Sequence, residues 1–256
     1  MFGKFLGIVT AEQSAAWTAF IAVIQLGTLA AVVMYFFKEL IQMTLSVGQD
    51  LKKHGLLPKP REWSVEGRLG LLIIVGTIPI GIAGVLLSDF IHGVFTKNLV
   101  VIGSSLIVLA LLLWLAERIA SHTREEGSLS WTEALLVGIA QALALIPGSS
   151  RSGTTITAGL FLGLKRQSAA RFSFLLSVPA VLASGVHEIL SLDANPFEFG
   201  AMNVLMATAV SAVSGYLAIA WLLRFLNKRT TLVFVWYRLL LGAVLLFLVF
   251  FNLVEP

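Results

Sequence analysis

The chain has 256 residues, of which 57% are hydrophobic and 12% charged, and its mean hydropathy is +0.91. This composition lies far outside the range of soluble domains and predicts an all-α polytopic membrane protein. The sequence contains no cysteine, which excludes a disulfide framework and a thiolate metal site. A net charge of +4 does not indicate nucleic-acid binding here, because the basic residues follow the membrane topology described below.

Apolar runs long enough to cross a hydrocarbon core of ~30 Å recur along a single membrane domain, residues 1–256. The predicted spans cover residues 17–37, 68–88, 98–116, 171–190, 201–222 and 232–252. Residues 131–164 differ, because two short apolar arms flank a Pro-Gly break. Such a segment predicts a re-entrant hairpin or a broken helix, which a membrane tolerates only when it is buried in protein or lines a wet cavity.

The charged loops define an orientation for these spans. Lysine and arginine gather in alternate loops, which by the positive-inside rule are cytoplasmic. The pattern alternates cleanly only if residues 131–164 enter and leave the membrane on this basic side, so the tip of the hairpin points toward a pocket on the outer, periplasmic face. The basic loops are 38–67, 117–130, 164–171 and 223–231, whereas loops 89–97 and 191–200 contain one lysine, Lys97.

The tip of the hairpin carries the candidate chemistry. Residues 147–155 read Pro-Gly-Ser-Ser-Arg-Ser-Gly-Thr-Thr. An arginine at bilayer depth costs roughly 2.5–3.5 kcal/mol on insertion scales, and the neighbouring hydroxyls cannot neutralise it. Together with free backbone N–H groups they can hold an anion, and Gly148 and Gly153 let the backbone approach it closely. A packing motif needs no arginine, so the segment predicts a phosphate-binding loop.

This nine-residue segment resembles the second signature of the bacterial undecaprenyl-diphosphate phosphatases of the bacitracin-resistance type. Four collinear landmarks extend the resemblance: Ala22–Thr28, Pro79, Phe172–Pro179 and the pair Tyr237 and Arg238. The resemblance implies a bacterial inner-membrane enzyme that hydrolyses undecaprenyl diphosphate to undecaprenyl phosphate and inorganic phosphate. This reaction recycles the lipid carrier of cell-wall synthesis and confers bacitracin resistance. The implied fold is a helical bundle of two inverted repeats, each with a re-entrant hairpin.

The resemblance also assigns roles within the signature. It implies catalytic roles for Ser150, Arg151 and Thr155, with Arg151 offering a bidentate fork to phosphate oxygens. A serine nucleophile needs an adjacent base, which this motif lacks, so a serine and an activated water both remain open as the nucleophile. The implied phosphate-binding residues are Gly148, Ser149, Ser152, Gly153 and Thr154.

The family implies further ligands and partners. A divalent cation, Mg²⁺ or Ca²⁺, is expected to shield the diphosphate, with unknown ligands in this chain. No organic cofactor is expected. The expected partners are a polyprenyl diphosphate substrate and membrane lipids, without nucleic acid, and a homodimer is left open.

The first signature of the family, which carries two glutamates, a serine and a histidine, does not occur in this sequence. Residues 1–16 resemble the segment that follows it, and Glu12 has a different context. We therefore expect either that the sequence starts at an internal methionine or that the chain is a degenerate relative that binds lipid phosphate without cleaving it. In both cases this chain as written has little activity, and only the second repeat keeps its hairpin tip.

Two rival functions and two structural interpretations complete the predictions. Inverted repeats with broken helices also occur in transporters, so a lipid-phosphate flippase and a non-catalytic lipid-phosphate binder are the alternatives. Arg238 is predicted to snorkel to the cytoplasmic interface beside Trp236 and Tyr237. Ser104 and Ser105 are predicted to be small packing residues.

Overall fold

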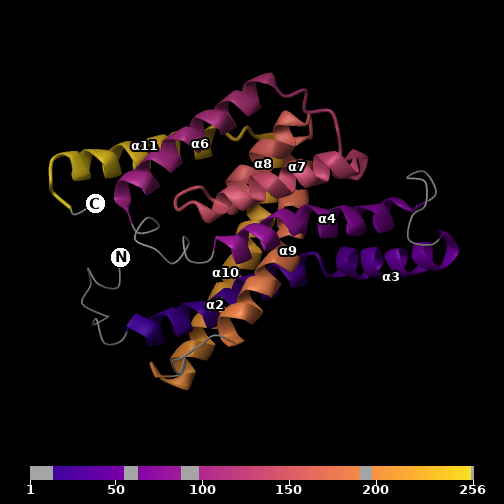
Figure 1. The fold of residues 1–256 in the computed structure, drawn as a ribbon, viewed down its shortest axis with the longest axis horizontal. Coiled ribbons are helices and arrows are strands. Elements are labelled where there is room, and N and C mark those ends of the chain that lie inside the picture. Colours follow the sequence, from indigo (N-terminus) through magenta and orange to yellow (C-terminus); the bar gives the residue numbers. More distant parts are fainter. Residues whose placement is uncertain (1–13, 55–62, 88–97, 191–197, 255–256) are drawn as a thin grey trace. The chain divides into compact units, whose positions relative to one another are not determined.

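The computed structural model describes residues 14–54, 63–87, 98–190 and 198–254, and within them the regular elements are helices (Figure 1). Five of these helices are long and apolar enough to span a membrane, or six if α2 together with α3 counts as a span. The prediction of an all-α polytopic membrane protein is confirmed. The elements are α2 (Ser14–Tyr35), α3 (Phe37–His54), α4 (Val65–Leu86), α6 (Leu99–Ile119), η2 (Glu126–Ser128), α7 (Trp131–Ala142), η3 (Leu143–Leu145), α8 (Arg151–Phe161), α9 (Arg166–Leu190), α10 (Ala201–Lys228) and α11 (Leu232–Phe250).

One segment expected to be a loop is helical. Residues 38–67 were predicted to be a cytoplasmic loop, but α3 fills most of that range. Its sequence alternates polar and apolar residues at helical spacing, so that Met43 is buried while Lys52 and Lys53 are exposed. The two lysines lie in the last turn, where positive charge interacts favourably with the helix dipole. The two lysines therefore belong to the end of a helix, and the prediction that this segment is a loop was wrong. Glu12 lies outside the described residues.

The described helices form two compact units. The first contains α2, the second half of α9 from Val178, and α10 up to Leu222. Within it α2 and α10 pack in parallel through small residues. A Cβ added at Gly215 would lie 3.0 Å from the Cβ of Ala31. Aromatic rings also cluster at one end of this pair, where Trp17, Phe20 and Phe199 have centroids 5.4–5.8 Å apart.

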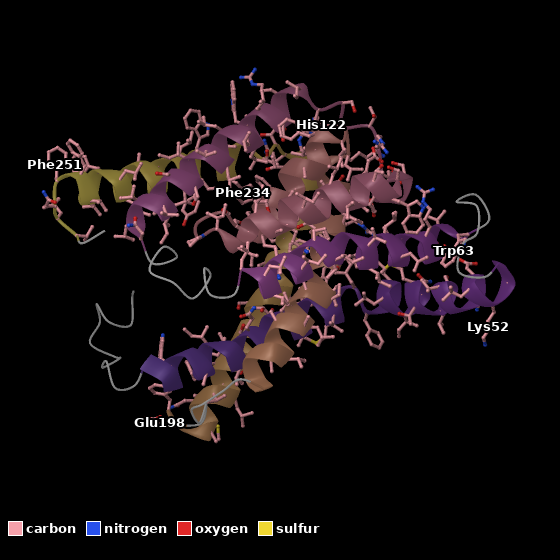
Figure 2. The ribbon with its side chains drawn as sticks, viewed as in Figure 1. Lys52, Trp63, His122, Glu198, Phe234 and Phe251 are labelled. Atoms are coloured by element: carbon pink, nitrogen blue, oxygen red, sulfur yellow. The ribbon has the colours of Figure 1, made fainter. Side chains whose placement is uncertain are left out.

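The second unit contains α3, α4, α6, α7, α8, α11 and the adjoining ends of α9 and α10. Here α6 packs antiparallel to α11, and Figure 2 shows His122 and Phe251 at opposite ends of this pair. Gly103 and Gly242 allow the close approach, because a Cβ on Gly242 would lie 2.9 Å from the carbonyl oxygen of Gly103. Helices α4 and α7 pack equally closely through Gly76 and Gly138. Helix α8 contacts α6 of the first pair and α7 of the second. These contacts position the hairpin that α7 and α8 form.

Candidate functional site

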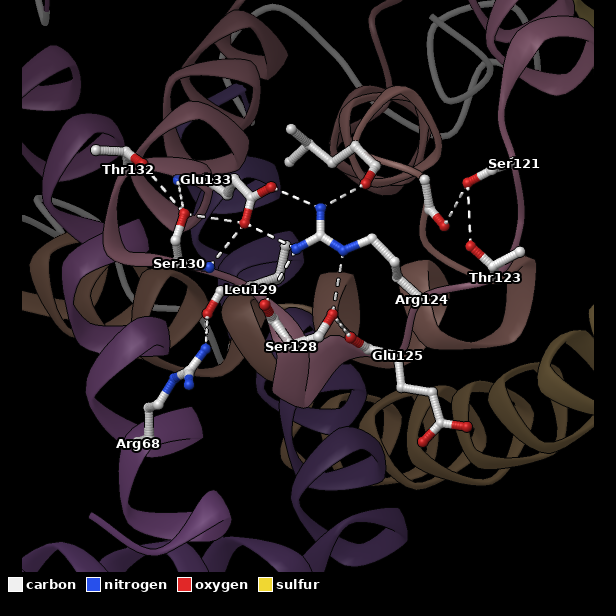
Figure 3. A network of polar contacts seen from close by, with 12 residues as sticks. Arg68, Ser121, Thr123, Arg124, Glu125, Ser128, Leu129, Ser130, Thr132 and Glu133 are labelled. Carbon is white, nitrogen blue, oxygen red and sulfur yellow. Dashed lines mark hydrogen bonds and ion pairs between the residues drawn. The ribbon is translucent and has the colours of Figure 1, made fainter. Parts of the chain in front are cut away.

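The base of the α7–α8 hairpin is held together by Arg124 (Figure 3). Its guanidinium bonds both carboxylate oxygens of Glu133 at the start of α7, at 2.6 and 3.0 Å, and the carbonyl of Leu162 after α8, at 2.9 Å. Backbone bonds from Arg124 to Gly163 and from Lys165 to Arg124 join the same two ends. The hairpin therefore begins and ends at one place, and its re-entry into a membrane stays a prediction.

The tip of the hairpin is a tight turn between two helices. After η3 the chain passes through Pro147, and α8 begins at Arg151. Gly148 has φ +83°, and a Cβ there would lie 2.6 Å from the carbonyl oxygen of Ile102. Ser150 has φ +62°, a conformation that costs a non-glycine residue about 1–3 kcal/mol and that clusters at functional sites. Its hydroxyl caps α8 by accepting the N–H of Gly153 at 3.3 Å.

The first turn of α8 presents unused hydrogen-bond donors. The backbone N–H groups of Arg151 and Ser152 bond no other group in the described part of the chain. The Arg151 guanidinium likewise makes no ion pair or hydrogen bond with a described residue. Free N–H groups at the start of a helix and a nearby cation together favour the binding of an anion. This arrangement suits phosphate oxygens.

The hydroxyl groups of the signature fall into two sets. Ser149 is 1% exposed, and its hydroxyl has no partner among the described residues. The hydroxyls of Thr154 and Thr155 instead lie 2.9 Å from the carbonyl of Arg151, and that of Thr155 is 2.6 Å from the hydroxyl of Ser173 on α9. Thr155 is thus engaged one turn inside α8, and its contact with a phosphate stays a prediction, as do the roles of the other signature residues.

Arg238 on α11 is a residue of the tip, which corrects the prediction that it snorkels to the interface. It is 7% exposed, and its Nη2 donates to the carbonyls of Gly148 and Ser149 at 3.0 and 2.9 Å. Val235 and Gly242, three residues before and four after it, are buried on the same helix face. The sequence predicted where Arg238 lies along the helix. It did not predict which face of the helix contacts the hairpin.

Two further polar residues at the tip were missed by sequence reasoning. Ser105 on α6, interpreted as a packing residue, donates its hydroxyl to the carbonyl of Pro147. Gln141, near the end of α7, is fully buried, and neither its amide nitrogen nor its oxygen has a partner in the described ranges. A glutamine on an otherwise apolar helix face was the signal available in the sequence. Through Ser105 the tip extends beyond residues 147–155, whereas Gln141 precedes the signature in the chain without a printed bond to it.

The donor set at the tip does not fit a divalent cation. It consists of hydroxyls, carbonyls and two guanidinium groups, whereas Mg²⁺ and Ca²⁺ prefer carboxylate oxygens. In the described part of the chain no group of three His, Asp or Glu residues is placed to hold a metal ion. Dependence on Mg²⁺ or Ca²⁺ therefore stays a prediction, and the chemistry below is derived from the tip residues alone.

A hollow of about 550 Å³ lies at the base of the hairpin. Half of its lining residues are charged, and each of these already forms an ion pair. Lys165 bonds Glu125 at 2.6 Å, and Arg171 bonds Glu126 at 2.9 Å. Because these charges satisfy each other, the hollow offers less to an anion than the tip does.

Known proteins align with nearly the whole chain. The sequence model of bacitracin resistance protein BacA matches residues 1–244. A protein from Syntrophobacter fumaroxidans named undecaprenyl-diphosphatase is 48% identical over 97% of this chain and 88% of its own length. Proteins of the same name from Myxococcus xanthus and Chloroherpeton thalassium are 49% and 46% identical, over 93% and 89% of this chain and 78% and 82% of their own lengths. The chain belongs to the family of bacitracin resistance protein BacA.

Proposed function

We propose that this protein hydrolyses undecaprenyl diphosphate to undecaprenyl phosphate and inorganic phosphate. Family membership and relatives named for this activity support the substrate and the reaction. The observation that carries the proposal is the hairpin tip, where Arg151 and the first N–H groups of α8 have no partner in the described chain. A lipid diphosphate brings its headgroup to a membrane-embedded site of this kind, and its phosphates match the donors.

The tip acts by electrostatic stabilisation and positioning. Charge spreads over the three equatorial oxygens of the transferred phosphoryl group in the transition state. The Arg151 fork and the N–H groups of Arg151 and Ser152 are donors of the kind that stabilise such charge. The strained turn at Ser150 fixes the start of α8 before substrate binds. A loop held in advance does not have to reorganise during the reaction, which is the origin of most electrostatic catalysis.

The bond changes follow from the products. In direct hydrolysis a water oxygen forms a new bond to the terminal phosphorus, while the bond from that phosphorus to the bridging oxygen breaks. The bridging oxygen leaves with its electron pair as part of undecaprenyl phosphate. One water proton stays on inorganic phosphate and the other passes to solvent. A base would speed this step, but residues 147–155 include no carboxylate or imidazole.

The proposal includes an orientation in the bacterial inner membrane. The base of the hairpin lies among arginines and lysines, which are enriched on the cytoplasmic side. The tip then faces the outer side, and a pocket there opens toward the periplasm. Cysteines introduced at Glu125 and at Asn252 in the cysteine-free chain test this orientation, because only the cytoplasmic one is expected to resist a membrane-impermeant thiol reagent.

The decisive experiment is phosphate release from undecaprenyl diphosphate by the purified chain in lipid nanodiscs, with EDTA, Mg²⁺ or Ca²⁺. Arg151→Ala is compared with Arg229→Ala, whose arginine is exposed just after α10. Phosphate release by this chain, expected to be low, should fall by about 100-fold or more in Arg151→Ala and stay unchanged in Arg229→Ala. The EDTA, Mg²⁺ and Ca²⁺ arms test the predicted need for a divalent cation. An active Arg151→Ala variant would refute the role of the tip. Transport of intact lipid into sealed vesicles without phosphate release would replace the phosphatase by a flippase.

A further inference from the structure

We propose that Arg238 supplies the second positive charge of a two-arginine anion site, which favours a diphosphate over a monophosphate. The inference rests on the proposed function, because it names the feature of the substrate that the tip recognises. Arg238 lies on α11, far in sequence from the signature that contains Arg151. The site is therefore built from two separate parts of the chain.

The Arg238 guanidinium lies between the turn and the first turn of α8. One nitrogen, Nη2, holds the carbonyls of Gly148 and Ser149. The other, Nη1, would lie 2.5 Å from a Cβ added at Gly153. The missing side chain of Gly153 thus makes room for the guanidinium beside the start of α8. Arg238 therefore lies beside the same turn of α8 that carries the unused N–H groups of Arg151 and Ser152.

Most of the hydrogen-bonding capacity of Arg238 is unused. A guanidinium has five N–H donors, yet both hydrogen bonds within the described chain come from Nη2. Its buried Nε has no hydrogen-bond partner among the described residues, and neither does the hydroxyl of Ser149. Carbonyl groups are dipoles and do not cancel a full positive charge. A nine-tenths buried cation with open donors requires an anion from outside the described chain.

Two cations at one helix start match a diphosphate better than a monophosphate. The described ion pairs of the chain all involve other residues, so no described carboxylate neutralises Arg151 or Arg238. The headgroup of a lipid diphosphate carries one phosphate more than that of a lipid monophosphate, and correspondingly more negative charge. One arginine with the helix N–H groups can serve the terminal phosphoryl group, while the second arginine stabilises the charge on the phosphate that leaves with the lipid.

Binding of two short lipids to the full chain in nanodiscs tests the inference. The probes are farnesyl phosphate and a methylene-bridged analogue of farnesyl diphosphate, whose P–C–P link cannot be hydrolysed. The variants are Arg238→Gln, Arg238→Lys and, as a matched control, Arg229→Gln. Arg238→Gln is expected to weaken binding of the bridged diphosphate about 10-fold or more, equivalent to about 1.4 kcal/mol, and that of the monophosphate less than about 3-fold. Arg238→Lys keeps the charge without the fork, so its loss should lie between Arg238→Gln and the control.

The outcomes separate the inference from the proposed function. Equal weakening of both lipids in Arg238→Gln would reduce Arg238 to a residue that only shapes the loop, and no weakening would remove it from the site. Either result overturns the inference while phosphate release by the unaltered chain still supports the function. Conversely, selective loss for the bridged diphosphate supports the two-arginine anion site even in a chain that releases no phosphate, so the two proposals are tested by separate measurements. Arg238→Lys decides the question if Arg238→Gln does not fold, as judged by its thermal unfolding.

Discussion

The arginines at the base of the hairpin differ from those at its tip. At the base Arg124 pairs with Glu133 at 2.6 Å, and Arg166 pairs with Glu117 at 2.6 Å. At the tip neither Arg151 nor Arg238 pairs with a carboxylate in the described chain. The two sets of arginines have opposite effects on the free energy of unfolding. A paired arginine stabilises the protein, whereas a buried unpaired one destabilises it until an anion binds.

The difference follows from the sequence around the two places. Glu117, Glu125, Glu126 and Glu133 all lie near the base, and Glu133 is the one carboxylate between Trp131 and Leu164. The tip is thus kept free of negative charge over a long stretch of chain. Stability and ligand binding are assigned to arginines at opposite ends of one hairpin, so substitutions can separate the two properties.

The largest effect is expected from Arg151→Met, which removes the charge at the tip and keeps much of the side-chain volume. Phosphate release should fall about 100- to 1,000-fold, equivalent to about 3–4 kcal/mol of transition-state stabilisation. Thermal stability should stay unchanged or rise, because an uncompensated and partly buried charge is removed. Arg124→Met is the matched substitution at the base and should lower the melting temperature. Reduced stability with normal activity in Arg151→Met would contradict the comparison.

Glu117→Ala tests how much the paired arginines at the base contribute to stability. Glu117 is 8% exposed and bonds Arg166 through one oxygen and the hydroxyl of Thr231 through the other, at 2.8 Å. Its removal leaves both partners unsatisfied and should lower the free energy of unfolding by about 3 kcal/mol. Chemical unfolding in detergent measures the loss. The exposed pair of Glu125 and Lys165 supplies the control, since Glu125→Ala should cause no measurable change.

Gly138→Ala tests whether activity depends on the position of the hairpin, because it displaces α7 without altering a charge. A Cβ at Gly138 would collide with the backbone of Gly76 on α4. Forcing α4 and α7 apart should cost about 1–3 kcal/mol of stability, and activity should fall as well, because α7 leads directly to the tip. Gly81→Ala on α4 is the control, since a Cβ there meets no atom within 4 Å. Equal behaviour of the two variants would show that close packing of α7 does not position the tip.

Sequence reasoning predicted the hairpin and its signature but not its neighbours. Hydropathy and loop charge predicted that residues 131–164 turn back on themselves, because insertion into a membrane depends on those same quantities. Arg238, Ser105 and Gln141 were missed because their roles depend on which helix face meets the hairpin. This choice is made by close contacts such as that between Gly103 and Gly242, which no local pattern in a single sequence specifies.

The smallest expected effect is the pH dependence of stability that Glu133 causes at the base of the hairpin. The hydrogen bond from Arg124, followed by bonds from Ser130, lowers the pKa of Glu133 to about 2 from an ordinary 4.5. Because the folded pKa is the lower one, the stabilisation is fully present above pH 4.5 and is lost as pH falls toward 2. A shift of this size corresponds to about 3 kcal/mol, and solvent screening of the half-exposed Arg124 reduces it to about 1–2 kcal/mol.

Glu133→Gln should therefore be less stable than the unaltered chain at pH 7, and the difference in stability should shrink below pH 4.5 and vanish only as the pH falls below about 2. Thermal unfolding at pH 7, 4.5 and 3 measures this decrease. Glu125→Gln, at a fully exposed ion pair, should follow the unaltered chain throughout. The tip lacks carboxylates in the described chain, so its anion binding should change in this range only through the charge of the phosphate ligand. A stability difference as large at pH 3 as at pH 7 would place the contribution of Glu133 in its capping bonds to Ser130 instead of its charge.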